Sequence, residues 1–126
     1  MIKILTSYFS YNDDRGKIYG IINDFKIEEL NIIESKKGSV RGNHYHKKTT
    51  ELVFVIDGKI EVLAQKISND GQLGSKEKIK VKKNDIFLIE PYLVHTFIAQ
   101  EDSKWLNALS IKHDPENPDF HEIKLI

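Results

Sequence analysis

Apolar and polar side chains alternate through most of the chain, in short runs that turn-forming residues interrupt. Because successive side chains of a β-strand point to opposite faces, this two-residue rhythm predicts strands rather than helices. It is clearest in residues 76–83, KEKIKVKK, where lysines alternate with Ile79 and Val81, as in an edge strand with one face in water. Only residues 25–30 fit a helical turn, and we expect one there.

The other strand candidates are separated by lysine, glycine, serine, asparagine and aspartate, which are frequent in turns. Residues 51–65, ELVFVIDGKIEVLAQ, predict a β-hairpin, because type I′ turns favour a pair such as Asp57-Gly58. Residues 68–76 and 113–119 are polar and are expected to be irregular connections. The remaining predicted strands are residues 17–22, 30–34, 40–46, 86–89, 95–99, 105–111 and 121–126. Eight or more short strands at this spacing predict a β-sandwich or barrel.

One predicted strand, Leu52 to Ile56, is apolar at every position. A strand with no polar face has to be covered on both sides. One face can fill the interior of a barrel, and the other needs a second sheet or a second subunit. The sequence therefore predicts a homodimer, with Leu52, Phe54 and Ile56 at an interface or in second-sheet packing.

Composition narrows the class of protein. A chain of 126 residues with 40% hydrophobic and 30% charged residues predicts a single globular domain over residues 1–126. Basic and acidic residues balance at 19 each, so no net field favours nucleic acid or an anionic membrane surface. No apolar run approaches the ~18 residues that span a bilayer, and no leader is recognisable. We expect a cytoplasmic location and no membrane partner.

The candidate chemistry lies in two short stretches. His44 and His46 are two residues apart and share one face of their predicted strand, while the polar residues 47–50 can turn the chain so that Glu51 joins them. His95 opens a separate strand and brings a third imidazole. The chain has no cysteine, so a metal site has to use imidazole and carboxylate. Three histidines and one carboxylate suit zinc, manganese, iron or nickel, with room for water or substrate.

The same four side chains have an alternative interpretation. Buried polar groups can satisfy one another by hydrogen bonds in a barrel that has no activity. Four converging titratable groups are nevertheless costly to bury without a ligand, which favours a functional site.

The spacing of these residues resembles the cupin family. Residues 38–58 match its first motif, with Gly38, His44, His46, Glu51 and Gly58 at the expected intervals. The second motif retains His95 in the right place, while its glycines, proline and asparagine are replaced by Asn84, Glu90, Tyr92 and Ala99. The resemblance implies an all-β fold, the double-stranded β-helix or jelly-roll barrel of cupins.

Two arginines indicate a class of substrate. Only Arg15 and Arg41 occur among the 19 basic residues, and each precedes a glycine. A guanidinium binds phosphate in a bidentate way that lysine cannot, so the pair points to a nucleotide-linked substrate. The alternative is that both make structural salt bridges near turns.

Within the cupins, DDRGKIYG and VRGNHYHKKTTELVFVIDG resemble enzymes of nucleotide-linked keto sugars. In the dTDP-4-dehydrorhamnose 3,5-epimerases the equivalent of His44 is the base. The dTDP-4-keto-6-deoxyglucose 3,4-ketoisomerases have Arg41, His44 and His46 in the active site, generally without metal. GNHYH with Glu51 and the tail HDPENPD is similar to the cupin domain of capsular-polysaccharide sugar reductases, in which the two histidines, the glutamate and the later histidine (here His44, His46, Glu51 and His95) hold zinc. Glu51, where the ketoisomerases tend to have an amide, favours the metal version.

The resemblance implies proton abstraction beside a ketone, by an epimerase or ketoisomerase of a 4-keto-6-deoxy sugar nucleotide in surface polysaccharide biosynthesis. A divalent metal, zinc above all, would be held by His44, His46, Glu51 and His95, with no organic cofactor. Without metal, His44 or His46 would itself be the base. A single imidazole nitrogen cannot both bind a metal and accept the proton of the substrate.

Further residues and functions complete the set of candidates. With metal bound, Tyr92 or Tyr19 is a candidate to move the proton, and we also assign Tyr19 to substrate binding with Arg15 and Arg41. Two other functions remain open: a metal- or sugar-binding module without turnover, and an iron-dependent dioxygenase. The second of these leaves both Arg-Gly pairs unexplained.

Overall fold

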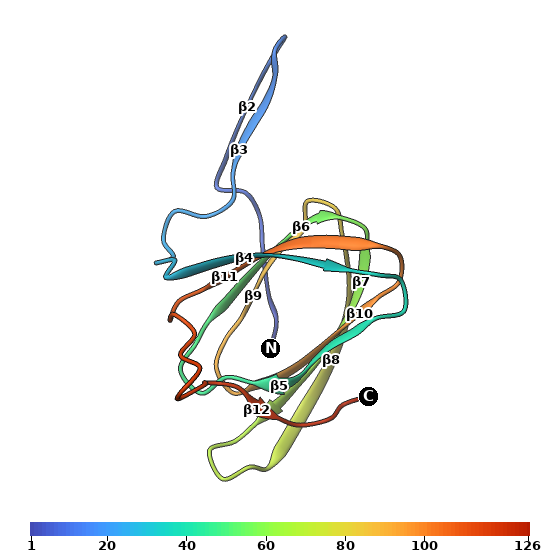
Figure 1. The fold of residues 1–126 in the computed structure, drawn as a ribbon. Coiled ribbons are helices and arrows are strands. Elements are labelled where there is room, and N and C mark those ends of the chain that lie inside the picture. Colours follow the sequence, from blue (N-terminus) through green and yellow to red (C-terminus); the bar gives the residue numbers. More distant parts are fainter.

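The computed structural model describes residues 1–126, and all of its regular structure is β-strand (Figure 1). The all-β prediction is confirmed, whereas the helical turn expected at residues 25–30 is wrong. No helix of the length and apolarity required to cross a membrane is present. The strands are β1 (Lys3–Leu5), β2 (Phe9–Asp13), β3 (Gly16–Gly20), β4 (Glu29–Ser35), β5 (Val40–Tyr45), β6 (Glu51–Asp57), β7 (Lys59–Ile67), β8 (Leu73–Lys82), β9 (Ile86–Ile89), β10 (Leu93–Ala99), β11 (Ser103–Leu109) and β12 (His121–Glu122).

Two five-stranded antiparallel sheets form the body, and the β2–β3 hairpin stands away from it (Figure 1). The strand orders are β1-β9-β6-β11-β4 and β12-β5-β10-β7-β8. Inward side chains of both sheets form the main core, with Val53, Phe87 and Trp105 from the first and Val62 and Phe97 from the second. This core fills one part of the barrel and leaves the other for polar residues.

The predicted hairpin at Asp57-Gly58 is wrong. Strand β6 pairs with β9 and β11, while β7 pairs with β8 and β10, so the chain crosses from one sheet to the other at this point. Gly58 has φ +98°, but Asp57 lacks the positive φ that a type I′ turn requires. A Cβ at Gly58 would overlap Ser103, so this crossing needs glycine.

Several other strand predictions are confirmed with shifts at their ends. Strand β8 is an edge strand, with Val81 buried and the lysines of its other face exposed. The predicted strand 121–126 pairs with β5 only over His121–Glu122. The irregular connection predicted at 68–76 ends earlier, because β8 begins at Leu73. Strands β1 and β2 were not predicted.

Both faces of β6 are covered, as its apolar sequence predicted. Val53 and Val55 lie in the main core, and Leu52 and Phe54 belong to a second buried cluster on the opposite face. That second cluster is covered in part by partly buried side chains of the chain's own N-terminal region: Leu5, Tyr19, Ile21, Ile22 and Phe25.

Candidate functional site

Three histidines converge inside the barrel. His44 lies on β5 directly opposite His95 of β10, and His46 follows at the end of β5. The His44 ring centroid lies 5.1 Å from that of His46 and 4.7 Å from that of His95. One nitrogen from each ring lies within 4.8 Å of the other two. The structure thus brings together the three imidazoles that the sequence placed on one face.

A β-bulge turns His44 inward. The register between β5 and β10 shifts at Gly42 and Asn43, which have φ +104° and +57°. A Cβ at Gly42 would lie 2.6 Å from the carbonyl oxygen of His95, so glycine is needed there as well. Asn43 is fixed by Thr96, whose hydroxyl donates to Asn43 Oδ1 at 2.8 Å. Apart from Gly42, nothing in the sequence had indicated this bulge.

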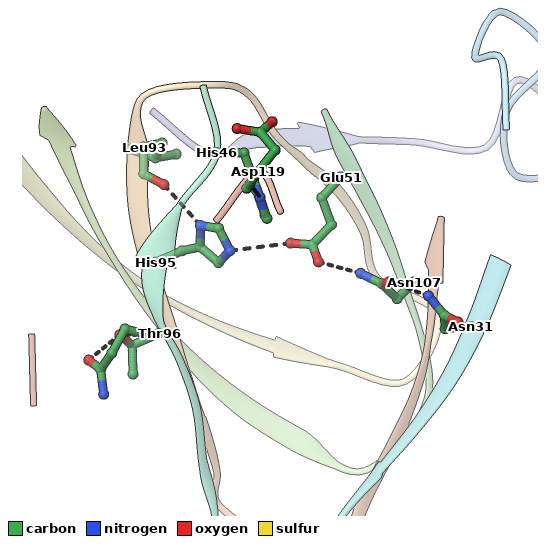
Figure 2. Close-up of polar contacts among 9 residues, drawn as sticks. Asn31, His46, Glu51, Leu93, His95, Thr96, Asn107 and Asp119 are labelled. Atoms are coloured by element: carbon green, nitrogen blue, oxygen red, sulfur yellow. Dashed lines mark hydrogen bonds and ion pairs between the residues drawn. The ribbon is translucent and has the colours of Figure 1, made fainter. Parts of the chain in front are cut away.

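The carboxylate comes from the other sheet. Glu51 is the first residue of β6 and is buried, with Oε2 3.4 Å from His95 Nε2. Its other oxygen accepts a hydrogen bond from Asn107 Nδ2, and Asn31 Nδ2 donates to Asn107 Oδ1 at 3.2 Å (Figure 2). These two asparagines fix which carboxylate oxygen faces the imidazoles. The sequence analysis missed them, although an asparagine inside the apolar run WLNAL was a usable signal.

Two of the imidazoles are held in a defined tautomer. His95 Nδ1 lies 2.9 Å from the carbonyl oxygen of Leu93, and His46 Nδ1 lies 2.7 Å from that of Asp119 (Figure 2). A carbonyl only accepts, so each Nδ1 carries a proton and donates it. In the neutral rings both Nε2 atoms are therefore acceptors, directed toward the cluster.

These acceptor atoms fit a metal ion. His46 Nε2, His95 Nε2 and Glu51 Oε2 are buried without a hydrogen-bond partner. A buried polar atom without a partner is costly, and three acceptors facing one another have no donor among them. A divalent cation that accepts nitrogen and oxygen ligands would satisfy all three.

Burial favours the uncharged forms of His44 and His46. It lowers the pKa of His44 to about 4, and the neighbouring His95 and His46 lower it further. Burial also lowers the pKa of His46. For Glu51, burial raises the pKa, but its attraction to His95, His46 and His44 in their protonated forms outweighs this effect, so the net pKa lies below the usual value. At neutral pH the cluster holds a carboxylate and a neutral His44.

A cavity of about 650 Å³ opens over the cluster. His44, His46 and Glu51 lie on its floor, and residues 110–120, called the strap below, form much of its wall. Phe120 of the strap lies 5.7 Å from the His44 ring and stacks on His113 at 5.4 Å. From the sequence this segment was expected to be an irregular connection and its HDPENPD stretch contributed to the family resemblance, but its place in the cavity wall was not predicted.

Arg41 belongs to the site, whereas Arg15 does not reach it within one chain. Arg41 lines a cavity of about 80 Å³ next to His44, Glu51 and His95, and its guanidinium donates to Ser35 Oγ and to the Glu34 carbonyl. Arg15 lies at the tip of the β2–β3 hairpin, 82% exposed, and pairs with Asp13 at 2.6 Å.

The two tyrosine candidates also lie apart from the cluster. The Tyr19 hydroxyl donates to Asn84 Oδ1 at 2.9 Å, and its ring packs near Phe54 on the outer face of β6. The Tyr92 backbone N–H donates to the carbonyl oxygen of His46 at 2.7 Å, but its ring lies against Tyr45. Within one chain, neither hydroxyl is directed at the imidazoles.

The sequence matches the family model described as Polysaccharide biosynthesis C-terminal domain over residues 11–121. Among curated proteins no sequence match was found.

Solved structures share the fold. A dTDP-4-dehydrorhamnose 3,5-epimerase from Sulfolobus tokodaii has a TM-score of 0.77 at 23% identity, over 92% of this chain and 73% of that one. A sugar 3,4-ketoisomerase from Thermoanaerobacterium thermosaccharolyticum in complex with TDP has a TM-score of 0.74 at 20% identity, over 95% and 86%. A capsular polysaccharide assembling protein from Staphylococcus aureus has a TM-score of 0.68 at 22% identity, over 93% of this chain but 34% of that one. The expected cupin jelly roll is confirmed.

The depressed pKa of His44 predicts a loss of stability in acid. The unfolded chain protonates this residue near pH 6.5, whereas the folded protein does so only near 4, so the free energy of unfolding should fall as the pH drops between these values. The contribution of His44 to this slope should be at most about 1.4 kcal/mol per pH unit, and smaller because His44 is partly exposed. Urea unfolding in chelator-treated buffer measures it. His44→Gln should flatten the curve and His113→Gln should not; equal curves for all three proteins would contradict the prediction.

Proposed function

Because the chain belongs to the Polysaccharide biosynthesis C-terminal domain family, we propose that it is an epimerase or ketoisomerase of a nucleotide-linked 4-keto-6-deoxy sugar. The observation that carries the proposal is the convergence of His44, His46, His95 and Glu51, three of which (His44, His46 and Glu51) line a large cavity. Similar folds include a 3,5-epimerase and a 3,4-ketoisomerase, the latter in complex with TDP. Their common chemistry begins with removal of a proton next to a ketone.

We assign His46, His95 and Glu51 to metal binding and His44 to proton transfer. The first three offer buried acceptor atoms without partners, held in position by hydrogen bonds at their other ends. A bound divalent metal, zinc in the first instance, would act as a Lewis acid toward the keto oxygen. His44 is partly exposed to the cavity and neutral at pH 7, so it is free to accept the proton.

The surrounding charges support this division of roles. The Glu51 carboxylate next to the cluster would stabilise the imidazolium that forms when His44 takes the proton. Lys47, Lys48 and Lys112 line the cavity wall, where their charges suit a diphosphate. Return of the proton to the same carbon from the other face gives an epimer. Return to the neighbouring carbon, together with transfer of a proton from the adjacent hydroxyl to the former keto oxygen, moves the ketone.

The proposal predicts solvent exchange. In D₂O, the protein should incorporate deuterium into dTDP-4-keto-6-deoxyglucose, as followed by mass spectrometry and NMR. His44→Ala should slow incorporation by at least about 100-fold, because it removes the general base. Tyr92→Phe should retain the rate, since the Tyr92 ring lies against Tyr45; a comparable loss would instead assign proton transfer to Tyr92. Tight sugar binding with no exchange would make the chain a non-catalytic binding module.

The metal assignment makes a separate prediction. Protein expressed with ample zinc should carry one equivalent by elemental analysis, and His46→Ala and Glu51→Gln should each lose it. His113→Ala is the matched control and should keep its metal, because His113 lies in the strap outside the cluster. Metal-free wild-type protein would contradict the assignment and leave His44 and His46 as an acid-base pair.

We also propose a homodimer. On the outer face of the first sheet, Leu30 and Ile32 of β4 remain 59% and 62% exposed. Phe9, Tyr11 and Ile18 are exposed on the β2–β3 hairpin, and a two-stranded hairpin is marginal in water by itself. A second copy would cover both surfaces, since exposed apolar surface of this kind commonly marks a protein–protein contact.

Light scattering after size exclusion should therefore give twice the 14.6 kDa mass of one chain. Ile32→Glu should shift the protein to monomer, because a charge would have to be buried. Leu73→Glu is the matched control: Leu73 is also an exposed apolar residue, on β8 of the other sheet, and its replacement should leave the dimer intact. A monomeric wild-type protein would refute the dimer.

A further inference from the structure

Asp119 of the strap makes a cluster of hydrogen bonds to the site. Its carboxylate accepts hydrogen bonds from the backbone N–H groups of Lys47, Lys48 and Thr49, each at 2.9 Å, and from the Thr49 hydroxyl at 2.8 Å. These N–H groups belong to the turn between β5 and β6, where no neighbouring strand pairs with them. Without Asp119 they would lack a protein partner, so the carboxylate holds both the strap and this turn in place.

The main chain of the same residue holds a cluster imidazole. The carbonyl oxygen of Asp119 accepts the Nδ1–H of His46 at 2.7 Å (Figure 2). His46 immediately precedes the turn that the Asp119 carboxylate binds. The carboxylate therefore fixes the position of the carbonyl, and the carbonyl fixes the proton and the ring orientation of His46.

We propose that Asp119 is a positioning residue that holds His46 as the Nδ1–H tautomer, with Nε2 directed at the cluster. The expected effect on metal binding rests on the proposed metal site. The tautomer of His46, by contrast, is a property of the metal-free protein. A ligand histidine commonly has its second nitrogen fixed by such a partner, and loss of the partner weakens metal binding about 10- to 100-fold.

His95 provides an internal control for the effect on His46. His95 has the same arrangement, but its Nδ1 partner is the carbonyl of Leu93, two residues away in β10. This contact does not involve the strap. Release of the strap should therefore change His46 and leave His95 as it is, whereas general damage to the barrel should change both.

The experiment is ¹⁵N NMR of the imidazole rings in metal-free full-length protein, followed by calorimetric titration with Zn²⁺. In the wild-type protein both rings should be Nδ1–H tautomers. In Asp119→Ala, His46 should lose the single-tautomer pattern, His95 should keep it, and the zinc Kd should rise about 10- to 100-fold. Asp114→Ala is the matched control, because Asp114 lies in the same strap and accepts only from its neighbours Glu116 and Asn117.

Each outcome either supports or refutes the positioning role of Asp119. An unchanged His46 pattern in Asp119→Ala overturns the proposal. If both rings change, Asp119→Asn, which keeps the side-chain volume, is measured in the same way. A change confined to His46 then supports the positioning role, and a change in both rings or in neither refutes it. Wild-type protein that binds no zinc would refute the metal assignment while leaving the tautomer result interpretable.

Discussion

The site depends on one electrostatic constraint, the burial of three acceptor atoms that face one another without a donor. The Nε2 atoms of His46 and His95 and the Oε2 atom of Glu51 are in this position because their opposite ends are already hydrogen-bonded. Each buried atom without a partner destabilises the fold by about 1–3 kcal/mol. A cation between them would offset that cost, and a proton taken up by the cluster would offset part of it. The same arrangement that is unfavourable for the empty fold is thus favourable for a ligand.

The cluster exists only because the barrel closes. His44 and His95 belong to one sheet and His46 directly follows the end of β5 in that sheet, while Glu51 begins a strand of the other. Glycines permit the close approaches that closure requires: Gly58 where the chain changes sheets beside Ser103, and Gly42 where the bulge lies against His95. Both have positive φ, which glycine adopts without the strain of a side chain. Substitution at either point would disturb the pairing of strands and, through it, the distances within the cluster.

The strap makes the cavity a defined space rather than an open end of the barrel. It forms much of the cavity wall, places Phe120 beside His44, and is hydrogen-bonded to the β5–β6 turn through Asp119. The cavity lining is mostly polar, and lysines contribute to it. His44 differs from the other two imidazoles in being partly exposed to this space. The structure therefore separates two rings whose Nδ1 atoms are hydrogen-bonded to carbonyl oxygens, His46 and His95, from the more exposed His44, and this difference is the basis of the roles proposed for them.

The sequence by itself determined the class of fold and the nucleus of the site. Two-residue alternation fixes strands, and the same parity places His44 and His46 on one face, because both properties depend only on local backbone geometry. It did not determine strand partners: the turn signal at Gly58 was real, but the packing of the whole core assigned its two strands to different sheets. Nor did it determine the residues that orient the ligands. Asn107 and Asp119 lie 56 and 73 residues from the groups they hold, and contacts across such distances are decided only when the tertiary structure forms.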